Sequence, residues 1–373
     1  MRIGLIRMRY TPYGGAEVFL NRFIAELIKR GHKADVFSSF WEGASGITVH
    51  KVDAGGPRFL RPLRFAENAE KEVGRVNPDI VLSLERTYCQ DIYRAGDGCH
   101  KEWLIQRAKT VSVTKRALIS INPLHMVLLN LEKRLFSSGR LKCVVANSNR
   151  VKEDIIRHYG LPEEKICVIY NGIDPGAFKG PDEAERARLR ASFGVNENTV
   201  LLLFVGSGFE RKGLLYAIRA LGFLKDKGDI RLLVIGKGKA DGYIAEAKRL
   251  GVEGRVMFKG PVEGASSYYQ AGDIFILPTI YEPFSNACLE AMAAGLPVIT
   301  SRINGASEIL SDGVNGGIVE NPLDHEEIAG KITLFLDKNK RVKAGELSRA
   351  EALKHPIERN VEEFLKLIEG LQR

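Results

Sequence analysis

The sequence contains no run of about 18 or more apolar residues, so it predicts no membrane-spanning helix. Its opening, residues 1–8, is too short and too interrupted by charge for a secretory signal peptide and is predicted to be a first strand. The five cysteines form no close pair and are odd in number, which argues against a disulfide framework. We therefore expect a protein of the reducing cytoplasm.

Patterns that bind metals or dinucleotides are also missing. The seven histidines show no metal-ligand spacing, and no Asp-x-Asp motif suggests a divalent ion. No G-x-G-x-x-G follows the first predicted strand, which disfavours a dinucleotide-dependent dehydrogenase. We therefore expect neither a metal ion nor a cofactor.

The composition indicates a folded protein with a basic surface. At 373 residues, with 45% hydrophobic residues, the chain is longer than one usual domain, so two domains with separate cores are expected. The net charge of +9 implies an acidic partner, which could be a nucleotide phosphate, a nucleic acid or an anionic membrane surface.

Much of this charge lies in residues 101–142, which hold nine Lys or Arg against two Glu. The segment mixes these cations with apolar residues such as Trp103 and Met126, as expected of a segment that lies in a bilayer interface. Core helices with solvated basic faces fit the same pattern equally well. Nucleic acid ranks lowest, because aromatic residues other than Trp103 do not alternate with the cations and no nucleic-acid module is present.

Two halves of the chain begin alike. A strand at residues 2–8, a glycine-rich turn, a helix at 16–30 and a strand at 34–38 form a βαβ opening, and an apolar strand at 199–206 starts the second half. We expect an α/β protein with two doubly wound, parallel-sheet (Rossmann-like) domains that face each other across a cleft. The expected domains are 1–172 and 173–355, with a helix at 356–373 that crosses back to the first domain.

The stretch at 281–300 predicts a loop, a short helix and a strand. Pro283 suits a first helical turn, Ser285 and Asn286 are good caps, and Gly295 ends the helix. Exposed amides at the start of such a helix form an anion site, and carboxylates nearby accept hydrogen bonds from sugar hydroxyls. A capped helix with one solvated glutamate is the alternative. The residues assigned to the site are Glu282, Pro283, Phe284, Ser285, Asn286 and Glu290.

Three other loops carry candidate residues. Arg211 and Lys212 follow the strand that ends at Gly206 and are expected where the next helix begins, a place that suits cations only when an anion is bound. Gly15 ends a turn that lets backbone approach a ligand, although a tight turn without a ligand is as compatible with the sequence. Asp97 lies between two glycines, where it is exposed to a sugar hydroxyl or serves only as a turn residue.

One motif consists of Glu282, seven intervening residues, Glu290 and then Ala-Met-Ala-Ala-Gly-Leu-Pro-Val-Ile, and it is preceded by residues 271–278. This motif resembles the donor-site signature of retaining GT-B glycosyltransferases of family 4. The resemblance implies that Glu282 contacts the donor sugar, Glu290 contacts the nucleotide ribose, and Arg211 with Lys212 contacts the phosphates. It implies that Gly15, Asp97 and, less directly, Glu17 lie near donor or acceptor. It also implies an acceptor-binding first domain and a donor-binding second one.

The first half of the chain is most similar to the lipopolysaccharide-core heptose glucosyltransferases of that family. The resemblance implies retaining transfer of a hexose, with glucose from UDP-glucose favoured, to a hydroxyl of lipopolysaccharide core or another cell-envelope glycan. An anionic membrane surface that binds 101–142 would place the protein on the inner face of the cytoplasmic membrane. Two alternatives are a nucleotide-sugar epimerase of the same architecture and a non-catalytic peripheral membrane protein.

Overall fold

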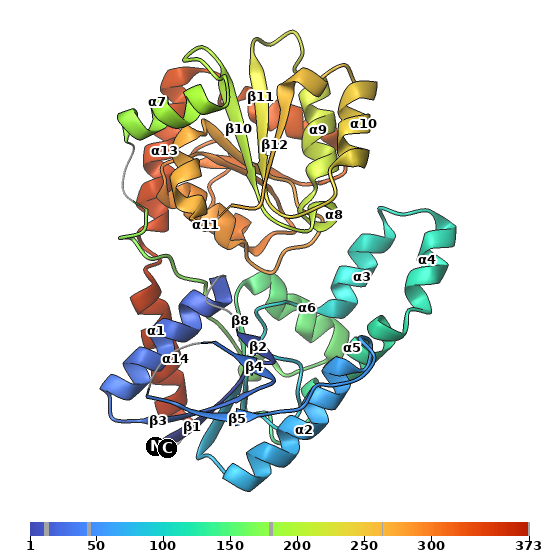
Figure 1. The fold of residues 1–373 in the computed structure, drawn as a ribbon, viewed down its shortest axis with the longest axis vertical. Coiled ribbons are helices and arrows are strands. Elements are labelled where there is room, and N and C mark those ends of the chain that lie inside the picture. Colours follow the sequence, from blue (N-terminus) through green and yellow to red (C-terminus); the bar gives the residue numbers. More distant parts are fainter. Residues whose placement is uncertain (11–14, 43–45, 179–181, 263, 372–373) are drawn as a thin grey trace. The chain divides into compact units, whose positions relative to one another are not determined.

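The structure is a computed structural model that describes residues 1–10, 15–42, 46–178, 182–262 and 264–371, without the side chains of 15–18 and 265. The chain forms two compact units (Figure 1). Unit 1 comprises Met1–Gly172 and Ile357–Arg373, and unit 2 comprises Ile173–Pro356.

Unit 1 is built on a parallel sheet with the strand order β5-β3-β1-β6-β7-β8-β9. Its central strands are buried on both faces, which explains their continuous apolar sequence. A short two-stranded sheet of β2 and β4 accompanies it. The strands are β1 (Arg2–Ile6), β2 (Arg9–Tyr10), β3 (Lys33–Ser38), β4 (Phe40–Trp41), β5 (Thr48–Lys51), β6 (Ile80–Ser83), β7 (Ile92–Arg94), β8 (Cys143–Ala146) and β9 (Ile166–Val168).

The helices of unit 1 connect these strands, and the C-terminal helix joins them. Phe364 of that helix packs against Phe19 and Phe23, with ring centroids 4.8 Å and 6.1 Å apart. The end of the chain therefore completes the core of unit 1. The helices are α1 (Gly15–Lys29), α2 (Arg61–Val76), α3 (His100–Ala108), α4 (Val113–Ser120), α5 (Pro123–Phe136), α6 (Asn149–Tyr159), η1 (Glu163–Lys165) and α14 (Ile357–Gly370).

Unit 2 repeats the architecture with a parallel sheet in the order β12-β11-β10-β13-β14-β15. Its central strand β10 pairs with β11 on one side and β13 on the other, and all three are apolar and largely buried. The strands are β10 (Val200–Val205), β11 (Ile230–Ile235), β12 (Val256–Gly260), β13 (Ile274–Leu277), β14 (Val298–Ser301) and β15 (Gly316–Val319).

α-Helices and short stretches of 3-10 helix link the strands of unit 2. They are α7 (Glu183–Ser192), α8 (Phe209–Lys212), α9 (Leu214–Gly222), α10 (Asp241–Arg249), η2 (Glu253–Arg255), η3 (Ala265–Ala271), α11 (Asn286–Ala293), η4 (Gly305–Ile309), α12 (His325–Thr333) and α13 (Lys338–Ala352). Two doubly wound parallel-sheet domains are thus confirmed, whereas the cleft expected between them stays a prediction.

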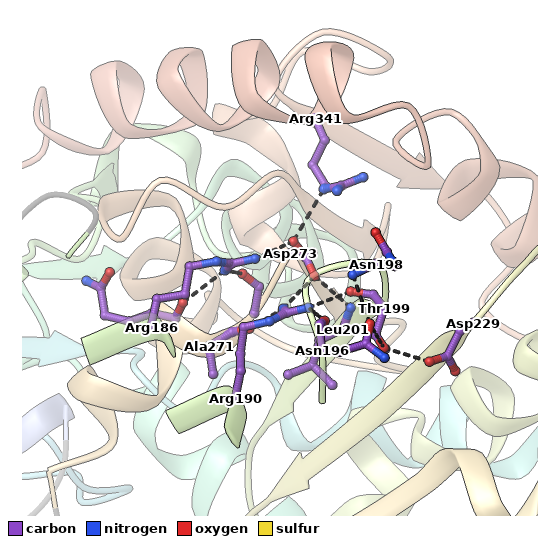
Figure 2. A network of polar contacts seen from close by, with 12 residues as sticks. Arg186, Arg190, Asn196, Asn198, Thr199, Leu201, Asp229, Ala271, Asp273 and Arg341 are labelled. Carbon is purple, nitrogen blue, oxygen red and sulfur yellow. Dashed lines mark hydrogen bonds and ion pairs between the residues drawn. The ribbon is translucent and has the colours of Figure 1, made fainter. Parts of the chain in front are cut away.

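A buried polar network fastens α7 and α13 to the sheet of unit 2 (Figure 2). Asp273, just before β13, lies 2.7 Å from a nitrogen of Arg186, 2.9 Å from one of Arg190 and 3.5 Å from one of Arg341. The same carboxylate accepts a hydrogen bond from the amide of Leu201 in β10. Because these contacts favour its ionised form, the pKa of Asp273 is lowered although burial acts to raise it.

Candidate functional site

Helix α11 begins where a serine cap ends the preceding loop. Ser285 Oγ accepts a hydrogen bond from the amide of Cys288, and the first helical residue is Asn286. Pro283 therefore lies before the helix. The prediction that it belongs to the first helical turn is wrong. Gly295 adopts a φ of 84° directly after the helix, in the left-handed region that favours glycine at a helix end.

The buried Asn304 occupies part of the predicted anion site. Its Oδ1 accepts hydrogen bonds from the amides of Ser285 and Ala306, and its Nδ2 donates to Thr300 Oγ1. The Ser285 amide thus donates to a partner within the protein, and the anion-binding role expected for it stays a prediction. Asn304 ties the start of α11 to the loop after β14, a role visible in the sequence only as an Asn-Gly pair.

Arg211 and Lys212 converge on one glutamate. Arg211 Nη1 and Lys212 Nζ lie 2.9 Å and 2.7 Å from the same carboxylate oxygen of Glu282. The two cations end the short helix α8, where positive charge complements the helix dipole, and directly precede α9, which begins at Leu214 as expected. Lys212 and Glu282 are both buried.

Two glycines lie beside these cations, and one of them allows a close approach of the backbone. Gly213 has a φ of 78°, and a Cβ there would lie 1.9 Å from the carbonyl oxygen of Pro278. The close approach lets the carbonyl of Arg211 accept hydrogen bonds from the Ile280 amide and the Thr279 hydroxyl. Gly206 lies against the Lys212 side chain, where a Cβ would make ordinary van der Waals contact at 3.4 Å.

Glu290 lies in α11 and is held by a tyrosine from η3. Tyr269, which is fully buried, donates its hydroxyl hydrogen to Glu290 Oε2 at 2.7 Å. Burial raises the pKa of Glu290, whereas this hydrogen bond and the charge of Lys212 act to lower it. Tyr269 was not selected in the sequence, where the only signal was two adjacent tyrosines before Gln-Ala-Gly-Asp.

Asp97 belongs to unit 1 and lies in the turn between β7 and α3. Its side chain is 68% exposed and 3.7 Å from Arg86 Nη1. Arg86 donates hydrogen bonds to the Gly98 carbonyl and to Glu132 Oε1, which also accepts the His100 amide. The buried Glu132 thus fixes both Arg86 and the start of α3. Since Arg86 also binds the Gly98 carbonyl, these hydrogen bonds hold the turn that contains Asp97 in place.

The other two predicted site residues of unit 1, Gly15 and Glu17, lie at the start of α1, next to residues that the structure does not describe. Gly15 is the first residue of α1, while the preceding residues 11–14 lie outside the description. The side chain of Glu17 also lies outside the described residues. The roles expected for Gly15 and Glu17 stay predictions.

The basic segment forms α3, α4 and α5, and α4 lies at the tip of this projection from unit 1 (Figure 1). No residue of α4 is buried. Val113, Leu118 and Ile121 expose 77%, 64% and 69% of their surface, beside the exposed cations Lys115 and Arg116. The end of the segment is different, because Leu131 and Leu135 of α5 are fully buried in unit 1.

The clustered residues of unit 2 offer cations for phosphate and carboxylates for hydroxyl groups. Among the described residues, no group of three or more His, Cys, Asp or Glu side chains could hold a metal ion. No helix within the described ranges is both long and apolar enough to cross a membrane.

Family models match both halves of the chain. Residues 13–177 match the model described as Glycosyltransferase Family 4, and residues 185–350 match that described as Glycosyl transferases group 1. Together the two matches cover most of both units.

Curated relatives extend over most of the chain. An uncharacterized glycosyltransferase of Methanocaldococcus jannaschii is 29% identical over 85% of this chain and 84% of its own length. The lipopolysaccharide glucosyltransferase WaaG of Escherichia coli K12 is 26% identical over 88% and 87%. A D-inositol 3-phosphate glycosyltransferase of Corynebacterium glutamicum is 28% identical over 93% and 91%.

Solved structures share the fold. The crystal structure of WaaG superposes with a TM-score of 0.84 at 24% identity, covering 99% of this chain and all of that one. The Anabaena protein Alr3699/HepE, solved in complex with UDP-glucose, superposes with a TM-score of 0.75 at 21% identity over 99% and 100%. With both halves matched by family models and the fold shared throughout, the chain belongs to the glycosyltransferases of GT-B architecture and is a transferase with a family 4 and a group 1 domain.

Proposed function

We propose that this glycosyltransferase transfers glucose from UDP-glucose to a hydroxyl of a lipopolysaccharide-core or other cell-envelope saccharide, with retention of the anomeric configuration. The observation that carries the proposal is the convergence of Arg211 and Lys212 on Glu282, next to Glu290. Two buried or half-buried cations beside two carboxylates match the phosphates and hydroxyls of a nucleotide sugar. The relatives named for glucosyl transfer and the structure with UDP-glucose support this donor.

Each residue has a proposed role. Arg211 and Lys212 bind the diphosphate and stabilise the charge that develops as UDP leaves, without a metal ion. Glu282 accepts hydroxyls of the sugar, and Glu290 accepts a hydroxyl of the ribose. Gly206 lies beside the Lys212 side chain at the donor, and the donor is also contacted by the loop beside Glu282, formed by Pro283, Phe284, Ser285 and Asn286. In unit 1, Asp97 contacts the sugar, while Gly15 and Glu17 lie near donor and acceptor.

Retention by front-face attack suits this site better than a double displacement. An enzyme nucleophile must present an available carboxylate oxygen to the anomeric carbon. In this proposal Glu282 accepts sugar hydroxyls and Glu290 accepts a ribose hydroxyl, so neither carboxylate is assigned to the anomeric carbon. The departing phosphate would then take the proton of the attacking hydroxyl. Trapping of a sugar on a carboxylate of the protein would contradict this mechanism.

Donor binding is the first test. The purified protein is mixed with UDP-, GDP- and ADP-sugars and observed by saturation-transfer NMR, together with the variants Lys212→Ala and Glu290→Ala and the control Lys227→Ala, an exposed lysine of unit 2. We expect UDP-glucose to bind the wild type and the control but neither site variant. A folded wild type that binds no donor would refute the proposal.

Transfer is tested with defined acceptors. UDP-glucose is incubated with glucose-free lipopolysaccharide core and, because inositol phosphate enzymes are among the relatives, with inositol 3-phosphate. We expect an α-linked glucoside of the core acceptor, identified from its anomeric coupling constant. Conversion of the nucleotide sugar to an epimer without any acceptor would favour the epimerase alternative instead.

We further propose that α4 and its neighbours bind an anionic membrane surface, which places the protein in the cytoplasm on the inner face of the cytoplasmic membrane. Exposed apolar side chains beside lysine and arginine are the features by which a helix lies in a bilayer interface. A glycolipid acceptor would be reached at the same surface.

Measurements of vesicle binding and of glucosyl transfer together distinguish a membrane-bound transferase from a non-catalytic membrane anchor. The variant with Val113→Ser, Leu118→Ser and Ile121→Ser should lose co-sedimentation with phosphatidylglycerol vesicles, whereas Phe59→Ser, at another exposed apolar residue of unit 1, should keep it. Both should retain transfer to a soluble acceptor. Vesicle binding that persists in the triple variant would contradict the membrane role of α4, and binding without any transferase activity would favour the anchor.

A further inference from the structure

Tyr269 needs support from outside its own element to hold Glu290. Its hydroxyl lies 2.7 Å from Glu290 Oε2, yet the residue belongs to η3, a stretch of 3-10 helix. Such helices have poorer hydrogen-bond geometry than α-helices and are seldom long, so η3 alone fixes the ring weakly.

Two arginines of α7 bind the backbone that follows Tyr269 (Figure 2). Arg186 Nη1 donates to the carbonyls of Gln270 at 3.0 Å and Gly272 at 2.7 Å, and Arg190 Nη1 donates to the carbonyl of Ala271 at 3.0 Å. Three consecutive carbonyls thus accept hydrogen bonds from one helix, which fixes the direction in which the chain leaves η3.

The arginines are themselves anchored to the sheet. Both pair with Asp273, and the carboxylate of Asp273 accepts the amide of Leu201 in β10. Arg190 is almost fully buried and also donates to the carbonyls of Asn196 and Thr199. Hydrogen bonds therefore run from the central strand through the arginines to the carbonyls of residues 270–272, and the backbone connects these residues to Tyr269, which binds Glu290.

We propose that Arg186 and Arg190 are positioning residues of the donor site, which hold the Tyr269 hydroxyl on one oxygen of Glu290 and leave the other oxygen for a ribose hydroxyl. The inference rests on the proposed function, in which Glu290 binds the ribose of a nucleotide sugar. It assigns a role in donor binding to α7, whose arginines would otherwise serve stability alone.

The protonation of Glu290 gives this role a measurable signature. The ionised carboxylate only accepts hydrogen bonds, with both of its oxygens, whereas protonation turns one oxygen into a donor and weakens its acceptance of a ribose hydroxyl. Burial raises the pKa of Glu290, and the groups that oppose this are Tyr269 and Lys212. Cys288, whose own pKa is raised by burial, is the further titratable group beside Tyr269. Without the tyrosine hydroxyl, the pKa of Glu290 should rise, so that the carboxylate takes up a proton at a higher pH than in the wild type. Donor binding should then weaken at this higher pH as the solution is acidified.

The test measures UDP-glucose affinity by calorimetry across a pH series for the full chain. The variants are Tyr269→Phe, Arg186→Lys and Arg190→Lys. The control is Arg188→Lys, because Arg188 lies on the same helix, is exposed and forms an ion pair with Glu185. We expect about tenfold weaker binding in the three variants, the scale of one lost hydrogen bond to a charged group. The control should match the wild type. The acid limb of the affinity profile should move to higher pH in Tyr269→Phe.

A double variant separates positioning from stability. If Arg186 acts through Tyr269, adding Arg186→Lys to Tyr269→Phe should weaken UDP-glucose binding no further, although it still lowers the melting temperature. Equal affinity in wild type, Arg186→Lys and Tyr269→Phe would overturn the inference and leave the proposed function standing. A folded wild type that binds no nucleotide sugar would overturn both. Should Arg190→Lys fail to fold, the comparison of Arg186→Lys with Tyr269→Phe decides.

Discussion

Lys212 Nζ lies 2.7 Å from Glu282 Oε2, the same oxygen that Arg211 approaches at 2.9 Å. One carboxylate therefore neutralises part of the charge that the proposed function assigns to the diphosphate. Donor binding would exchange this internal ion pair for contacts with phosphate, so Glu282 both competes with the diphosphate and recognises the sugar.

Replacing Glu282 by Gln should separate these two effects. UDP alone should bind Glu282→Gln as tightly as the wild type or more tightly, because two cations lose their internal partner. Glucosyl transfer should fall by about 100-fold or more, the scale on which one polar contact to a transition state acts. Calorimetry with UDP and a transfer assay check the two outcomes. Weaker UDP binding in this variant would contradict the competition.

Asp97→Asn should reduce glucosyl transfer while UDP binding stays unchanged. Asp97 is exposed in unit 1, whereas the proposed diphosphate contacts belong to unit 2, so the substitution leaves those contacts intact. The control Glu67→Gln changes an exposed carboxylate of unit 1 on α2. Transfer rates and UDP affinity of both variants provide the measurement, and undiminished transfer in Asp97→Asn would remove Asp97 from the site.

Asp273→Asn should destabilise unit 2 by about 3–5 kcal/mol, since removing one partner of a buried ion pair leaves charge uncompensated. The pKa of Asp273 is lowered in the folded protein, so its contribution is present above the unfolded pKa of about 3.9 and is lost as pH falls through the folded pKa. Urea unfolding at neutral and acidic pH checks this. The difference between variant and wild type should shrink on acidification, whereas the exposed Arg188→Lys should resemble wild type at every pH.

Asp154 should show the opposite pH dependence. Burial raises its pKa to about 6, and neither carboxylate oxygen has a hydrogen-bond partner among the described residues, although Arg157 lies 3.3 Å away. A raised folded pKa contributes stability that is complete below the unfolded pKa and is lost as pH rises through about 6.

Asp154→Asn should therefore remove a gain in stability that the wild type shows on mild acidification. Thermal unfolding across a pH series gives the measurement, and Glu153→Gln, its neighbour on α6, is the matched control. A variant that keeps the wild-type pH dependence would exclude Asp154 as its source.

Local sequence was sufficient for several of the elements that surround the candidate site. The apolar strands, the helix after Ser285 and the Gly295 stop follow from short-range rules, because strand burial and helix ends depend on neighbouring residues. The family resemblance that rested on Glu282 and Glu290 was confirmed by the family models. These features are readable because they need no knowledge of distant contacts.

Tertiary structure alone decided which groups share a hydrogen bond or a charge. In the folded chain both cations of α8 form ion pairs with Glu282, the Ser285 amide donates a hydrogen bond to Asn304, and Tyr269 donates one to Glu290. Those partners are separated by 19 to 71 residues or lie in different elements, and no periodicity encodes which of them meet. The sequence determined what each element is, whereas packing around a common sheet determined which side chains act together.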